Sequence, residues 1–134
     1  MEGVTETLLF TLYMRYRESK RPDGKLSDKR YSDLVNSIDF DFSIFDEIPD
    51  DIQLSIACRS LIFDTLTRHF IETHPESIVV SLGSGLDFRQ ERLDNGKAVW
   101  IDIDVPEVIA LRNAFFPETT RHYSISSSIL DFSW

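Results

Sequence analysis

One segment indicates the fold of this chain, Ser77-Ile78-Val79-Val80-Ser81-Leu82-Gly83-Ser84-Gly85-Leu86-Asp87. Its apolar run is short, rich in β-branched residues, and ends at two glycines that are one residue apart. Such a run predicts a buried parallel strand, followed by a turn whose backbone comes close to a ligand. About 20 residues further on, a second apolar run ends with two carboxylates, Val99-Trp100-Ile101-Asp102-Ile103-Asp104-Val105-Pro106.

The order of these features is typical of α/β folds that hold an adenosine-containing cofactor: strand, glycine turn, helix, strand and acid. Gly83 and Gly85 are the predicted contacts of the turn, because glycine lets the backbone approach a ligand and the next helix start offers N–H groups. A Gly-X-Gly pair alone is equally typical of an ordinary strand-to-helix turn. The acid at the end of the next strand favours the ligand interpretation, and we predict a nucleotide-cofactor half-domain.

Phe88 stands where a dinucleotide fingerprint has its third glycine. Its bulk argues against a pyrophosphate, and hence against NAD, and favours a cofactor without phosphates such as S-adenosylmethionine. Asp104, the last acid before Val105-Pro106, is the predicted ribose ligand. Asp102 lies two residues earlier on the same strand face, and it is predicted either to bind the cofactor as well or to orient a neighbour.

Composition excludes several classes of partner. The 134 residues carry a net charge of -9, and the pI is about 4.7. This acidity argues against nucleic acid and anionic membranes, because phosphate binding needs a basic face. The single cysteine, Cys58, cannot form an internal disulfide, and no apolar run approaches the roughly 20 residues of a membrane helix. The N-terminus lacks a signal-peptide pattern, and we predict a cytoplasmic protein.

The rest of the chain predicts helices before the first strand and one more strand after the second. Apolar spacing indicates helices from Thr5 to about Lys20, from Asp28 or Lys29 to Ser37, and from about Asp50 to Thr73. Residues 39–45 are predicted to form a loop with buried aromatic anchors. Pro106 is placed to open a helix, and His122 to Ser126 is the candidate third strand. The apolar stripe of the long helix is predicted to be Ile52, Ile56, Leu61, Ile62, Leu66, Phe70 and Ile71.

These elements predict an α/β fold of partial Rossmann-like type, with two to three parallel strands and N-terminal helices. Five or six strands are usual in such a sheet, so one edge and part of its apolar faces would lie open. We expect either a truncated piece of a larger enzyme or a chain that finishes its sheet with another chain.

Other polar residues are given ordinary roles. The histidines His69, His74 and His122 show no ligand-like spacing, so no metal site is predicted and surface or helix-end positions are expected. Asp94, like Glu91, is predicted to be solvated. Trp100 is predicted to belong to the core rather than to an adenine platform.

At these residues the sequence resembles the leucine carboxyl methyltransferase family, which includes bacterial polyketide O-methyltransferases. The resemblance covers nearly the whole chain, and its most specific parts are the Leu-Gly-X-Gly-Leu-Asp and Asp-X-Asp-X-Pro blocks. Further matching positions lie in the helices, the aromatic loop and the C-terminal part: Thr5-Glu6-Thr7 to Arg17, Ile38–Phe42, Arg59, Arg89, Arg92-Leu93, Phe115-Phe116-Pro117 and Leu130–Trp134.

The resemblance implies a class I fold and S-adenosylmethionine as the cofactor. In the family an arginine on the helix before the first strand pairs with the cofactor's carboxylate, and Arg59 has that place. The family's pattern further assigns Gly83 to the lining of the cofactor and Asp104 to its ribose. Ser128 and Ile129 fall near the adenine, although some members carry an aspartate where this chain has Ser128.

Family members continue past the length of this chain, so the resemblance implies a partial cofactor site. It predicts residues 1–50 as a helical lid or extension and residues 51–134 as the N-terminal half of the cofactor-binding domain. The implied reaction is O-methylation of a carboxylate or hydroxyl, on a small molecule or a C-terminal leucine, with no catalytic residue assigned. The alternative is a non-catalytic cofactor-binding or assembly module that completes its sheet with a partner chain or a second copy.

Overall fold

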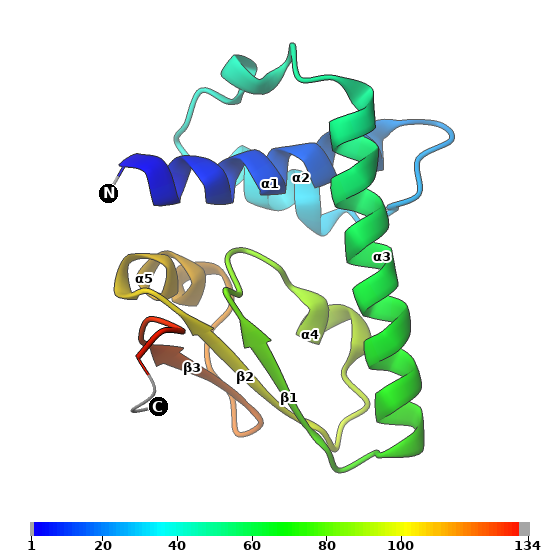
Figure 1. Cartoon of the computed structure of the whole chain (residues 1–134), viewed down its shortest axis with the longest axis vertical. Coiled ribbons are helices and arrows are strands. Elements are labelled where there is room, and N and C mark those ends of the chain that lie inside the picture. Colours follow the sequence, from blue (N-terminus) through cyan, green and yellow to red (C-terminus); the bar gives the residue numbers. More distant parts are fainter. Residues whose placement is uncertain (1, 132–134) are drawn as a thin grey trace. The chain divides into compact units, whose positions relative to one another are not determined.

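The computed structural model describes residues 2–131. The chain divides into two compact units, Met1–Phe63 and Asp64–Trp134. The long helix α3 (Asp50–Thr73) begins in the first unit and ends in the second. Figure 1 shows the order of the elements along the chain. Among the helices of the described chain, none combines the length and apolarity that crossing a bilayer requires.

The first unit is helical, as the apolar spacing predicts. Helix α1 (Glu2–Lys20) and helix α2 (Arg30–Ser37) occupy the expected positions, and α2 buries Tyr31, Leu34 and Val35. The predicted loop contains a 3-10 turn, η1 (Phe42–Phe45), with both phenylalanines buried. Its start is capped by the carboxylate of Asp41, which accepts a hydrogen bond from the amide of Ser43 at 3.1 Å.

Aromatic contacts join α1 to η1. The ring of Tyr13 stacks on Phe42 with centroids 5.2 Å apart, and Phe10 meets Phe45 edge-on at 5.5 Å. The Tyr13 hydroxyl donates to Asp46 Oδ1 at 2.7 Å. Burial and then this hydrogen bond to a carboxylate raise the pKa of Tyr13 to about 12.

The second unit is built on a parallel sheet of three strands in the order β1 (Ile78–Leu82), β2 (Val99–Asp104) and β3 (His122–Ser126). In Figure 1 the three arrows point the same way. Val80 is paired with Ile101, and Ile101 with Tyr123. The predicted α/β class, the parallel strands and the third strand are confirmed.

One face of this sheet is covered by helical segments. Ile71 of α3 and Leu93 of α4 (Arg89–Leu93) pack with Ala98 and Trp100, so the prediction that Trp100 is a core residue is confirmed. Helix α5 (Pro106–Phe115) opens with Pro106 at its first position, as predicted, and covers the same face near β3. Because alternate residues of a strand share a face, Asp102, two residues after Trp100 on β2, also lies on this covered side.

The opposite face is open along β1, although Ile103 of β2, which pairs with Leu82 on this face, is buried. The sequence predicts β1 to be buried, yet Ile78, Val80 and Leu82 are 60%, 45% and 57% exposed. The prediction is wrong for these three residues, because Ile71 of α3 and Leu93 of α4 pack on the side of β1 that carries Val79. The stripe of α3 is likewise only partly buried: Ile56 and Ile71 are buried, one in each unit. The exposed members are Ile52, Ile62, Leu66 and Phe70.

Candidate functional site

The glycine turn follows β1 at the carboxyl edge of the sheet. Gly83 and Gly85 adopt φ values of 65° and 50°, in the left-handed region that favours glycine. The amide of Gly83 donates to Ile103 O at 2.9 Å, which ties the turn to β2. A Cβ built on Gly83 would meet no atom within 4 Å. The residue therefore leaves open space beside the backbone, where a ligand could approach.

Asp104 joins the end of β2 to this turn. Its Oδ2 accepts a hydrogen bond from the amide of Gly85 at 2.8 Å, and its Oδ1 accepts one from Val105 N at 2.8 Å. The carboxylate is only partly buried. Since an ionised carboxylate offers about four acceptor positions, lone pairs remain for ligand hydroxyls.

The segment after β3 reaches the same edge. The amide of Ser127 donates to Asp104 O at 2.9 Å, which places Ser128 one residue away from the acid's backbone contact. Ser128 and Ile129 are exposed. We call Gly83, Gly85, Asp104 and Ser128 the carboxyl-edge site. Of the matching block 130–134, Phe132–Trp134 lies outside the described residues.

Asp102 faces the covered side and holds two basic groups. Its Oδ2 accepts from Arg112 Nε at 2.9 Å and Nη2 at 2.5 Å, and His122 Nε2 lies 2.5 Å from the same oxygen. Burial of the carboxyl opposes ionisation, but the hydrogen bond with His122 and the charge of Arg112 outweigh it. The pKa of Asp102 is therefore below its ordinary value. These contacts correspond to the second predicted role of Asp102, orienting a neighbour.

Arg112 and His122 are functional candidates that sequence reasoning missed. The expectation of a surface or helix-end position is wrong for His122, which is buried at the start of β3. Arg112 follows the inward-facing Val108 and Ile109 at helical spacing. A cation on the apolar side of a helix, opposite an acid on the adjacent strand, is the signal that could have identified it.

Asp94 is not the solvated acid that the sequence predicts. It accepts two hydrogen bonds from Arg121, at 2.7 and 2.6 Å, and one from Trp100 Nε1 at 3.0 Å. Two segments far apart in sequence bring these donors together, which local composition does not reveal. Asp94 therefore has a structural role.

The matching arginines after the glycine turn take part in a second ion network. Arg89 Nε and Arg92 Nε donate to the buried Asp64 at 2.7 and 3.0 Å. Both arginines also pair with Asp87. These contacts join α4 and Asp87 of the turn to α3, and they stabilise the position of the turn.

Arg59, the predicted partner of the cofactor's carboxylate, lies on α3 with an exposed side chain. It belongs to the first unit, whereas the carboxyl-edge site belongs to the second. Its contact with the cofactor stays a prediction.

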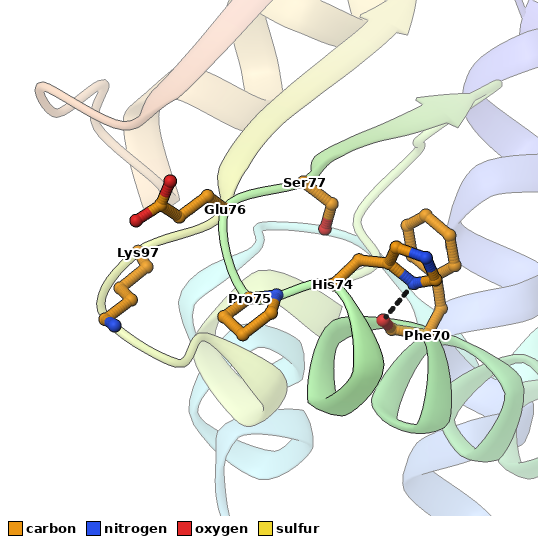
Figure 2. Close-up of a pocket in the computed structure, with 6 residues that line it drawn as sticks. All are labelled: Phe70, His74, Pro75, Glu76, Ser77 and Lys97. Atoms are coloured by element: carbon orange, nitrogen blue, oxygen red, sulfur yellow. Dashed lines mark hydrogen bonds between the residues drawn. The ribbon is translucent and has the colours of Figure 1, made fainter.

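A pocket of about 490 Å³ lies at the other end of β1. Figure 2 shows its lining, with the ring of His74 beside that of Phe70 and the side chains of Glu76, Ser77 and Lys97 around the loop ends. The two rings stack with centroids 4.8 Å apart. The pocket precedes the amino end of the strand, whereas α/β sheets bind ligands beyond the carboxyl ends. We therefore assign the candidate site to the glycine turn and not to this pocket.

Comparison with known proteins shows what the chain is similar to. The family model for leucine carboxyl methyltransferase matches residues 9–124. The chain is 36% identical to the tetracenomycin polyketide synthesis O-methyltransferase TcmP of Streptomyces glaucescens, over all of this chain and 50% of that protein. It is 29% identical to the S-adenosyl-L-methionine-dependent methyltransferase dpfgK of Gibberella zeae, over all of this chain and 49% of that protein. The chain thus spans about half the length of these curated relatives.

Proposed function

The chain belongs to the leucine carboxyl methyltransferase family, and from this premise we propose that its carboxyl-edge site binds the adenosyl part of S-adenosylmethionine. The family uses this cofactor as its methyl donor. The observation that carries the proposal is the hydrogen bond from Gly85 N to Asp104 Oδ2 at 2.8 Å. This bond brings the glycine backbone that follows β1 into contact with the acid at the end of β2.

Each residue of the proposed site has a physical task. The remaining lone pairs of Asp104 accept the ribose hydroxyls, and the open space beside Gly83 admits the cofactor's amino-acid part. Arg59 pairs with the cofactor's carboxylate, because a guanidinium fork matches a carboxylate at two points. Ser128 and Ile129 lie near the adenine. Asp102 acts indirectly, through Arg112.

We propose O-methylation of a carboxylate or hydroxyl as the activity of the whole protein, with a small molecule or C-terminal carboxylate as the acceptor. The cofactor supplies a methyl group on a sulfonium, which an oxygen nucleophile can accept. A carboxylate acceptor needs little help from a base, so positioning supplies most of the acceleration. In this proposal, residues 51–134 are the N-terminal half of the cofactor domain, residues 1–50 are a helical extension, and the protein acts in the cytoplasm.

Titration calorimetry of the 134-residue chain tests the cofactor. S-adenosylmethionine, S-adenosylhomocysteine and NAD are titrated separately. Heat of binding with the two sulfur compounds and none with NAD supports the proposal. Binding of NAD alone would instead favour a nicotinamide-binding domain, and binding of none would remove the cofactor function from this chain.

A second candidate function is favoured by the open sheet face. Ile78, Val80 and Leu82 present exposed apolar side chains on β1, which is an edge strand of the described sheet. The edge of β1 can pair with a strand of a second copy or a partner chain that continues the sheet, and the apolar face can pack against that partner. Sedimentation of the chain and of the Val80→Glu variant tests this, with Ile44→Glu as an exposed apolar control in the first unit. Association that is lost only in Val80→Glu supports the assembly function, and a monomer at all concentrations contradicts pairing with a second copy.

A further inference from the structure

We propose that Arg112 is a positioning residue for the carboxyl-edge site, because its guanidinium fixes the peptide groups of the glycine turn in the orientation that receives the cofactor. The inference rests on the proposed function for the identity of the ligand. The orientation of the turn itself can be tested without any ligand.

The guanidinium makes contacts on two sides. Nε and Nη2 donate to Asp102 Oδ2, at 2.9 and 2.5 Å. Nη1 donates to the carbonyl oxygens of Gly85 and Asp87, at 2.9 and 2.5 Å. Arg112 is only 1% exposed. One buried side chain therefore connects the acid of β2 with two peptide groups of the turn after β1.

The position of the guanidinium is itself fixed. Asp102 lies on the central strand of the described sheet, and His122 contacts the same carboxylate oxygen from β3. On the other side, the guanidinium lies 4.9 Å from the centre of the Phe116 ring. A planar fork with fixed donors suits these simultaneous contacts better than a single ammonium group.

The consequence for the turn follows from peptide geometry. In a planar trans peptide the C=O and N–H bonds point in opposite directions, and the described peptide bonds are trans. When Arg112 holds the carbonyls of Gly85 and Asp87, the amides of Leu86 and Phe88 point away from it. The carbonyl oxygens of Gly85 and Asp87, which would repel an anionic group of a ligand, thereby point toward the guanidinium of Arg112.

Gly85 is held from both ends. Its amide donates to Asp104, and its carbonyl accepts from Arg112. The position of Arg112 therefore sets the place of Gly85 relative to the proposed ribose acid. This gives the buried Arg112–Asp102 pair a role in binding as well as in stability.

Arg112→Lys and Arg121→Lys form a matched pair of variants. Arg121 also donates twice to one aspartate, Asp94, and once to a backbone carbonyl, that of Ala98. These hydrogen bonds go to residues outside the glycine turn, so replacing Arg121 reports the effect of losing a guanidinium fork elsewhere in this unit. For each variant of the 134-residue chain, the folded fraction is measured by circular dichroism, and S-adenosylhomocysteine is titrated into the folded protein. The backbone amide signals are compared by ¹H–¹⁵N NMR without ligand.

We expect Arg112→Lys to shift the Gly85 and Leu86 amide signals and to weaken S-adenosylhomocysteine binding at least about tenfold, the cost of one lost charge-assisted hydrogen bond. Arg121→Lys should change neither. Unmoved Gly85 and Leu86 signals in Arg112→Lys, or an equal loss of affinity in both variants, would overturn the inference. A wild-type chain that binds no S-adenosylhomocysteine would instead refute the proposed function, while the ligand-free amide signals would still decide whether Arg112 orients the turn.

Discussion

The amide of Gly85 and the carboxylate of Asp104 are hydrogen-bonded at 2.8 Å across the ends of β1 and β2. The two residues lie at corresponding ends of paired parallel strands, since Leu82 pairs with Ile103 just before them. Parallel strands bring their carboxyl ends to one edge of the sheet, and this is where α/β proteins bind their ligands. The bond therefore joins the glycine turn and the acid at this edge of the sheet.

Asp104→Asn tests the assignment of the ribose acid. The amide keeps the size of the side chain but loses the charge and part of the acceptor capacity. The affinity for S-adenosylhomocysteine, measured by calorimetry, should fall by about 2 kcal/mol. Glu76→Gln, which removes one charge near the opposite end of β1, should leave the affinity unchanged. Equal losses in both variants would reduce the effect to net charge and contradict a specific role for Asp104.

Gly83→Ala, compared with Gly96→Ala, distinguishes the effect of backbone strain on stability from the effect of a side chain at Gly83 on cofactor binding. Gly96 is the matched control, because it also has a positive φ, 79°, and a Cβ there would likewise meet no atom within 4 Å. Both alanine variants should lose about 1–2 kcal/mol of unfolding free energy from the left-handed conformation, as measured with urea. Only Gly83→Ala should also lose cofactor affinity. If Gly96→Ala weakens binding equally, the open space at Gly83 has no special relation to the ligand.

Arg59→Ala tests the residue assigned by family resemblance. Leaving the cofactor's carboxylate unpaired should cost on the order of 2 kcal/mol of binding free energy if that group is desolvated. Arg68→Ala removes another exposed arginine from the same helix and should have little effect. Calorimetry with S-adenosylhomocysteine gives both values, and an unchanged affinity in Arg59→Ala would remove this residue from the site.

Tyr13 gives a prediction for stability at alkaline pH. Its pKa is raised to about 12 in the folded chain, whereas an unfolded tyrosine titrates near about 10. The neutral folded form is therefore favoured, and this contribution to stability is present below about pH 10 and is lost as the pH rises toward about 12. The unfolding free energy of the wild type should fall more steeply over this interval than that of Tyr13→Phe. Tyr16→Phe is the control, and its unfolding free energy should depend on pH as that of the wild type does. Parallel curves of unfolding free energy against pH for the wild type and Tyr13→Phe would contradict the role given to Tyr13.

The elements that local patterns specify could be predicted from the sequence. The apolar run Ile78–Leu82 predicts a strand, and the two turn glycines predict a backbone turn. Pro106 predicts the start of a helix. Each of these signals lies within a few residues. The sequence also predicts Asp104 as the acid near the turn, because it is the last acid of its strand. These predictions depend only on neighbours along the chain and on the rule that parallel strands end at one edge.

The partners of Asp102 and Asp94 could not be predicted in this way. Asp102 contacts Arg112 and His122, and Asp94 contacts Arg121, over separations that local periodicity does not report. The exposure of β1 was also missed, because an apolar run indicates burial without showing which face receives helices. Pairing between distant charges is a property of the packed unit, so it becomes visible only once the elements are placed.

The most direct test of the central claim is a ¹H–¹⁵N NMR titration of the 134-residue chain with S-adenosylhomocysteine. We predict that the largest amide shifts fall at Gly83, Gly85, Asp104 and Ser128, where the strands end. Shifts concentrated at His74, Ser77 and Lys97, around the pocket before β1, would contradict the account, as would a spectrum that the ligand leaves unchanged.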